Sequence, residues 1–99
     1  MPPVVIWSPH AVACVRRLYD FLAEKSPDAA RAAAASLLRQ AEHLGRFPNA
    51  GRPAADLEPE HRELPVSFGG AGYVLLYHFD ATTEAVTILA VRHQKEVGY

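Results

Sequence analysis

Serine followed by proline occurs at two places early in this chain, at Ser8-Pro9 and at Ser26-Pro27. A serine hydroxyl accepts hydrogen bonds from the free N–H groups of a first helical turn, and the fixed φ of proline suits the first helical position. Each pair is therefore expected to begin a helix. Because proline disfavours the helical conformation in the residue before it, the first helix is expected to end by Ser26.

Apolar residues recur with helical spacing after each of the two pairs. The first helix is expected over residues 9–25 and is amphipathic. The second, from Asp28 to about Gly45, is rich in alanine, which favours helices and lets a neighbouring helix approach closely. Since the connection is short, the helices are expected to form an antiparallel αα-hairpin. The apolar stripe of the second helix consists of Ala30, Ala34, Leu37, Ala41 and Leu44.

Short β-prone segments flank the hairpin. Val4 to Trp7 is expected to be a strand because it is β-branched and aromatic. Three further strands are expected over residues 62–68, 73–80 and 85–92. Residues 46–59 are expected to be a surface loop, and residues 69–72 a turn. Consecutive strands with short turns form an antiparallel meander. The order β-α-α-β-β-β therefore predicts a two-layer α+β domain, with the αα-hairpin packed on an antiparallel sheet.

Composition limits the class of protein. The 99 residues are expected to form one domain, residues 1–99. The net charge of −1 excludes a polycationic nucleic-acid coat. A single cysteine, Cys14, excludes an internal disulfide and a cysteine-based zinc site. Because no apolar run reaches the ~20 residues that cross a bilayer and no charged leader is visible, the expected location is the cytoplasm, with no membrane partner.

Five segments, in this order and spacing, are together typical of one family. They are Val5-Ile6-Trp7-Ser8-Pro9, Phe47-Pro48-Asn49-Ala50-Gly51-Arg52, Arg62-Glu63-Leu64, Gly72-Tyr73-Val74-Leu75-Leu76-Tyr77 and Ile88-Leu89-Ala90-Val91-Arg92-His93. Through them, essentially the whole chain resembles the RelE/ParE superfamily of bacterial type II toxins, the toxin halves of toxin–antitoxin modules. The resemblance implies a cognate antitoxin whose C-terminal segment wraps the toxin.

The superfamily divides by target. RelE-like members are implied to cut mRNA in the ribosomal A site, with the 2′-OH of the RNA as nucleophile. ParE-like members are implied to inhibit DNA gyrase. In the RelE-like interpretation, Arg62 would neutralise phosphate, His93 would act as acid or base, and Tyr99 would orient the attack. Where similar nucleases carry an arginine after the aromatic residue that opens a strand, this chain has Val74.

Charge favours the ParE-like alternative. Residues 51–99 carry four basic and seven acidic residues, a net charge of −3. An enzyme that works on RNA is expected to repel phosphate less than this. We therefore expect a gyrase inhibitor that needs no cofactor or metal, with residues 47–53 and 92–99 as interaction surfaces. The residues expected to bind the partner are Arg52, Arg92, Lys95 and Tyr99. A RelE-like endonuclease and a non-toxic, antitoxin-binding relic of the same fold remain alternatives.

Some of these residues also have structural interpretations. Arg62 is a candidate for cross-strand pairing with Glu60 or Glu84. His61, close to Glu58 and Glu60, suggests a metal ligand, but hydrated loop residues are the better interpretation. A sheet with one helical layer leaves its other face partly open, which is typical of a protein interface.

Overall fold

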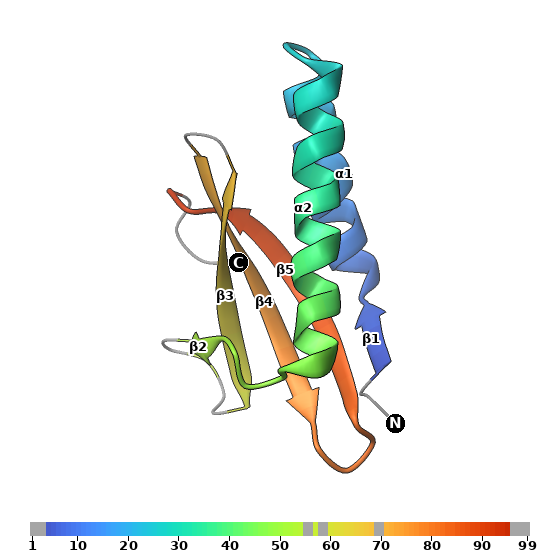
Figure 1. Cartoon of the computed structure of the whole chain (residues 1–99), viewed down its shortest axis with the longest axis vertical. Helices are drawn as coiled ribbons and strands as arrows, with labels where there is room; N and C mark the ends of the chain where they lie inside the picture. Colours follow the sequence, from blue (N-terminus) through green and yellow to red (C-terminus); the bar gives the residue numbers. More distant parts are fainter. Residues whose placement is uncertain (1–3, 55–56, 58–59, 69–70, 96–99) are drawn as a thin grey trace.

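The computed structural model describes residues 4–54, 57, 60–68 and 71–95. Its elements are β1 (Val4–Trp7), α1 (Pro9–Ala23), α2 (Pro27–Arg46), β2 (Arg52–Pro53), β3 (His61–Phe68), β4 (Ala71–Asp80) and β5 (Ala85–His93). In the described residues, the strands form one sheet in the order β1-β5-β4-β3-β2. Figure 1 shows both helices on one face of this sheet. The predicted two-layer α+β fold is confirmed.

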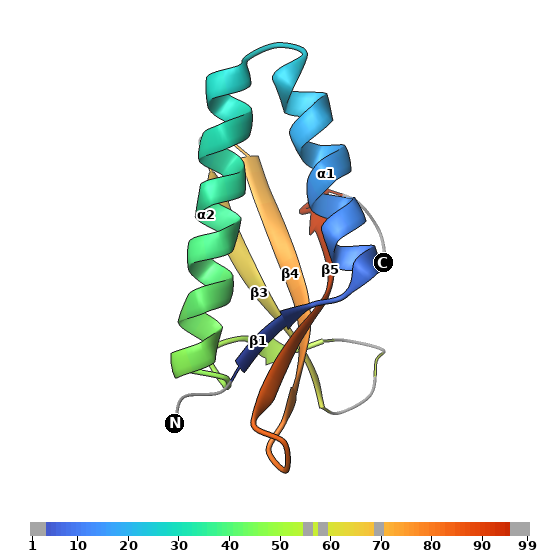
Figure 2. The same ribbon diagram turned by 90° about the vertical axis from the view of Figure 1, so that its right-hand side faces the viewer.

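Both helices begin where the Ser-Pro pairs predict. The Ser8 hydroxyl accepts a hydrogen bond from the Ala11 N–H at 3.0 Å, and the Ser26 hydroxyl accepts one from the Ala29 N–H at 3.2 Å. The first helix ends two residues earlier than expected, at Ala23. Figure 2 shows the predicted antiparallel hairpin lying over the strands. No helix in the described ranges has the length and apolarity to cross a membrane.

The sheet differs from the expected meander in three details. β1 pairs in parallel with β5, so the sheet is mixed, although β3, β4 and β5 are antiparallel as predicted. Inside the segment predicted to be loop, Arg52 and Pro53 form the short strand β2 beside β3. β4 begins at Ala71, where residues 69–72 were expected to turn, because Gly72 pairs with Ser67. Backbone pairing across the sheet overrides the low intrinsic strand preference of proline and glycine.

The helices cover the face of the sheet on which the odd-numbered residues of β4 lie. Tyr73, Leu75 and Tyr77 of β4 are buried beneath the hairpin, and Phe79 is half-buried. The buried side of α2 carries Leu37, Ala41 and Leu44, which belong to the same core. Cys14 is buried there as a small apolar residue. The structure therefore buries four of the five residues of the expected α2 stripe; the exception is Ala34, which is half-buried while its neighbour Ala33 is buried.

A bulge in β5 connects the sheet to α1. The pairing of β4 with β5 shifts between Leu76 and Tyr77, so that Leu89 has no direct partner on β4. The Ser8 hydroxyl donates a hydrogen bond to the Leu89 carbonyl oxygen at 3.2 Å, and the Ser8 N–H donates one to the Ile88 carbonyl oxygen at 2.9 Å. Because bulges re-aim the backbone, this irregularity positions the start of the first helix.

The opposite side of the sheet is called here the helix-free face. Alternation along the strands places these residues on it: His61, Glu63, Val74, Leu76, His78 and Arg92. Val74 and Leu76 are buried even here. The face therefore has an apolar floor between ionisable side chains. One of these is Arg92, which was expected to bind a partner.

Candidate functional site

The segment after α2, residues 47–53, is called here the clamped loop because two sheet side chains hold it. The fully buried Tyr77 donates its hydroxyl proton to the Pro48 carbonyl oxygen at 2.7 Å and accepts a hydrogen bond from the Gly51 N–H at 2.8 Å. Nη1 of Arg62 donates to the Gly51 carbonyl oxygen at 2.8 Å. A β-carbon at Gly51 would lie 2.7 Å from the Tyr77 hydroxyl oxygen, so glycine is required.

This arrangement corrects the cross-strand pairing suggested for Arg62. Its guanidinium is bound to the backbone of the clamped loop, whereas the expectation was Glu60 or Glu84. Burial raises the pKa of Tyr77, although the Gly51 N–H and the nearby charge of Arg62 oppose that rise. Arg62 therefore stabilises a loop that places Phe47 in solvent, where its side chain is 56% exposed.

On the helix-free face, Glu63 lies between two arginines that were predicted to bind a partner. Its carboxylate accepts a hydrogen bond from Nε of Arg52 at 2.9 Å and lies 4.0 Å from Nη2 of Arg92. The Glu63 and Arg92 side chains are only 12% and 17% exposed, whereas that of Arg52 is 59% exposed. Glu63 therefore supplies one negative charge between two positive charges, and its contact with Arg52 is the closer of the two.

Sequence reasoning missed this role of Glu63. Alternation along β3 does separate Glu63 from Arg62, because successive strand side chains point to opposite faces. It does not reveal that Arg52 of β2 and Arg92 of β5 reach the same carboxylate. Val74, directly opposite Arg92, is 2% exposed and lies in the floor of this face.

A pocket of about 470 Å³ lies between α1 and the ends of β4 and β5. Among the residues that the structure describes, Arg17, Arg92 and His93 line it, and no acidic side chain does. The His93 ring meets the Tyr73 ring edge-on, with centroids 5.5 Å apart, and its Nδ1 accepts a hydrogen bond from the Lys95 N–H at 3.0 Å. Burial raises the pKa of Tyr73. This pocket suits an apolar group that carries negative charge.

The residues predicted for RNA cleavage do not form one cluster. Arg62 pairs with Tyr77, whereas His93 pairs with Tyr73, four residues away along β4. At ~3.3 Å per residue, this places the two side chains roughly 13 Å apart along the sheet. Tyr99 lies outside the described residues. The structure therefore does not bring Arg62 and His93 into contact around one reacting group.

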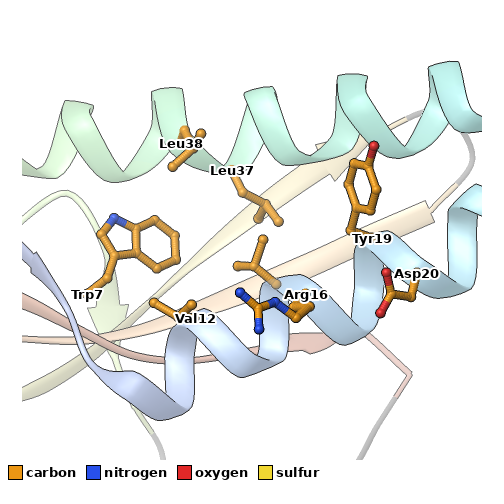
Figure 3. A pocket seen from close by; sticks show the side chains of 8 residues that line it. Trp7, Val12, Arg16, Tyr19, Asp20, Leu37 and Leu38 are labelled. Carbon is orange, nitrogen blue, oxygen red and sulfur yellow. The ribbon is translucent and has the colours of Figure 1, made fainter.

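An apolar groove of about 610 Å³ runs between α1 and α2. Figure 3 shows Trp7 of β1 at one end and Tyr19 toward the other. Val12 and Leu38 on its walls are 45% and 53% exposed. Exposed apolar surface of this kind is typical of a protein interface, so the hairpin offers a second surface for a partner.

Comparisons with known proteins agree on one family. The family model described as the ParE toxin of the type II toxin–antitoxin system parDE matches residues 5–98. Toxin RelE3 of Caulobacter vibrioides is 36% identical over 88 residues, which cover 89% of this chain and 90% of that protein.

Solved structures share the fold. The chromosomal ParDE toxin–antitoxin system from P. aeruginosa matches with a TM-score of 0.75 and 21% identity, covering 92% of this chain and 95% of that one. The toxin–antitoxin complex RelBE2 from Mycobacterium tuberculosis matches with a TM-score of 0.66 and 23% identity, covering 95% and 100%. At these identities, the two matches establish the architecture.

Proposed function

Since this chain belongs to the ParE toxin family of type II toxin–antitoxin systems, we propose that it is a cytoplasmic toxin that inhibits DNA gyrase by binding and is neutralised by a cognate antitoxin. The toxin class follows from family membership. The choice of gyrase as target is carried by the helix-free face.

The side chains of that face support binding more than RNA cleavage. Cleavage by a 2′-OH needs cations that stabilise the developing charge on phosphorus. Glu63 offsets part of the positive charge of Arg52 and Arg92, and Val74 occupies the centre of the face. Arg62 points to the opposite face of the sheet, where it is bound to the clamped loop. These contacts support a toxin that acts by binding a protein.

An antitoxin partner is supported by two surfaces. The groove between α1 and α2 is apolar and open, and the pocket beside His93 is basic. A disordered segment that folds on binding would cover both types of surface. The P. aeruginosa and M. tuberculosis structures are themselves named as toxin–antitoxin systems.

Gyrase supercoiling with the purified chain tests the proposal. Inhibition is expected with the chain alone, and supercoiling should recover when the product of the neighbouring reading frame is added. Unchanged supercoiling at large molar excess would exclude gyrase as the target. Normal growth during expression without an antitoxin would instead indicate a non-toxic relic that only binds its antitoxin.

A second candidate is a RelE-like, ribosome-dependent mRNA endonuclease. It is favoured by the relative named Toxin RelE3 and by the presence of Arg62, His93 and Tyr99. Primer extension on mRNA during translation distinguishes it from gyrase inhibition. A-site cuts that vanish in His93→Ala combined with Tyr99→Phe would support the nuclease, and the absence of such cuts would reject it.

A further inference from the structure

Strand pairing brings two histidines of the helix-free face together. His61 of β3 lies directly opposite His78 of β4. The His61 carbonyl oxygen accepts a hydrogen bond from the Ala54 N–H at 3.0 Å. Because the N–H and C=O of one residue in an antiparallel strand point to the same side, both backbone groups of His61 point away from β4. The two histidines therefore form a non-hydrogen-bonded pair, the kind in which opposing side chains lie closest. Their ring centroids are 5.6 Å apart.

The two rings have nitrogen atoms available for a ligand. In the described part of the chain, neither ring makes a hydrogen bond, and Nδ1 of His61 is buried without a partner. Both side chains are only half-buried, so solvent reaches the pair from the helix-free face. An unsatisfied buried polar atom costs free energy, and a ligand that uses imidazole nitrogens would remove part of that cost.

The spacing of the rings suits a shared metal ion. Imidazole nitrogen binds Zn²⁺ at about 2.0–2.1 Å, which places the centres of two rings on one ion roughly 5 to 6 Å apart. The observed 5.6 Å lies in this range. The rings are inclined by 42°, and rotation about their side-chain bonds between rotamers is what would aim one nitrogen of each ring at a common ion.

We propose that His61 and His78 bind one borderline divalent transition-metal ion, such as Zn²⁺, Ni²⁺ or Cu²⁺, with water in the remaining positions. Among the described residues, no group of three His, Cys, Asp or Glu side chains could hold a metal. The site would therefore be open and exchangeable. Imidazole selects these ions over Mg²⁺ and Ca²⁺, which prefer oxygen ligands.

The charges around the pair bear on how pH would affect it. Glu63 and Asp80 share the face, two residues from His61 and His78 respectively, and Arg52 of β2 and Arg92 of β5 flank Glu63. The Thr82 and Thr83 N–H groups lower the pKa of Asp80, with a smaller contribution from His78. Asp80 therefore supplies negative charge near the pair without leaving its turn.

Calorimetric titration of the tag-free chain with NiCl₂ near neutral pH tests the proposal, because one ion should bind per chain. Binding should disappear at about pH 5, well below the reference histidine pKa of ~6.5, because protonated imidazole cannot bind a metal. Mg²⁺ should give no binding. His61→Ala and His78→Ala should each weaken Ni²⁺ binding by at least about tenfold, because the remaining imidazole acts alone.

Two control variants separate this site from others. His43→Ala removes an exposed histidine of α2 and should leave Ni²⁺ binding unchanged. His10→Ala removes the ring that lies 3.5 Å from the Cys14 sulfur, a rival pair of ligands. His61→Gln and His78→Gln, checked by circular dichroism, repeat the test if alanine disturbs folding. Absence of binding to the wild-type chain, or loss only with His10→Ala, would overturn the proposal.

Discussion

At the scale of single residues, Tyr77 does the most to connect the core with the surface. Its ring is fully buried beneath the helices, and its hydroxyl makes two hydrogen bonds to the clamped loop. Tyr73, four residues earlier on the same face, is almost as buried, but its hydroxyl makes no hydrogen bond within the described residues. Because the two rings are similarly buried, comparing variants of the two tyrosines isolates what the hydroxyl hydrogen bonds of Tyr77 contribute to stability.

Replacing Tyr77 with phenylalanine should destabilise the fold. The change keeps the ring but leaves the Gly51 N–H and the Pro48 carbonyl oxygen without their partner, at a cost of about 1–3 kcal/mol. Tyr73→Phe should cost less than about 1 kcal/mol. Urea denaturation of both variants measures the difference. Equal losses would mean that the hydroxyl contacts contribute nothing.

Alkaline pH should weaken the same clamp. Burial raises the pKa of Tyr77 above its ordinary value of 10.0, so the folded chain keeps the phenol protonated where the unfolded chain ionises. Its contribution to the free energy of unfolding is therefore full below the ordinary value and is lost as pH rises through the folded value. Urea denaturation between about pH 8 and pH 11 should show a smaller decline for Tyr77→Phe than for wild type. If stability fell equally with pH in both proteins, the loss would come from another ionising group, such as Tyr73.

At the scale of elements, the two helices begin with the same signal but differ in attachment. Ser8 caps α1 and also bonds to the Ile88 and Leu89 carbonyl oxygens in the bulge of β5. The Ser26 side chain accepts only the N–H of Ala29, at the exposed end of the hairpin. The cap at Ser8 therefore also hydrogen-bonds the first helix to the sheet, whereas the cap at Ser26 lies within the hairpin.

The two caps predict different losses on substitution. Ser26→Ala should cost about 0.5–1 kcal/mol, the ordinary value of a helix cap. Ser8→Ala should cost about 1 kcal/mol more, because the Leu89 carbonyl oxygen also loses its side-chain donor. Thermal unfolding of both variants, compared with wild type, checks the order. A larger loss for Ser26→Ala would contradict it.

At the scale of the whole molecule, two exposed phenylalanines lie at opposite ends of the hairpin. Phe21 lies near the turn between the helices, lines the basic pocket and is 61% exposed. Phe47 follows the last residue of α2, at the other end of the hairpin, and its ring lies 4.9 Å from that of His43. Aromatic residues, phenylalanine included, are enriched in protein interfaces. The two side chains are therefore far enough apart to be tested separately as contacts for a partner.

If the proposed function holds, the two phenylalanines should have separable roles. Phe47→Ala should reduce gyrase inhibition by about tenfold and leave antitoxin binding intact, while Phe21→Ala should do the reverse. Both variants should unfold within about 1 kcal/mol of wild type because both side chains are exposed. Supercoiling assays and co-purification with the neighbouring gene product measure the two activities. Loss of both activities in one variant would contradict the separation.

Much of the fold follows from local signals in the chain. Ser8-Pro9 and Ser26-Pro27 mark both helix starts, and alternation identifies the buried stripe of β4. The strand β2 was not predictable, because two residues that include a proline carry no periodic pattern. The early start of β4 was not predictable for the same reason, because the glycine-rich sequence before Tyr73 carries no periodic pattern.

The candidate sites depended on contacts between distant residues. The sequence alone determined the helical hairpin, the three main β-strands and the family resemblance, because capping, periodicity and turn preference act over a few residues. Only the tertiary structure decided that His61 faces His78, that Glu63 lies between Arg52 and Arg92, and that Arg62 binds the clamped loop. These contacts depend on strand order and register, and a shift of one residue would move each side chain to the opposite face.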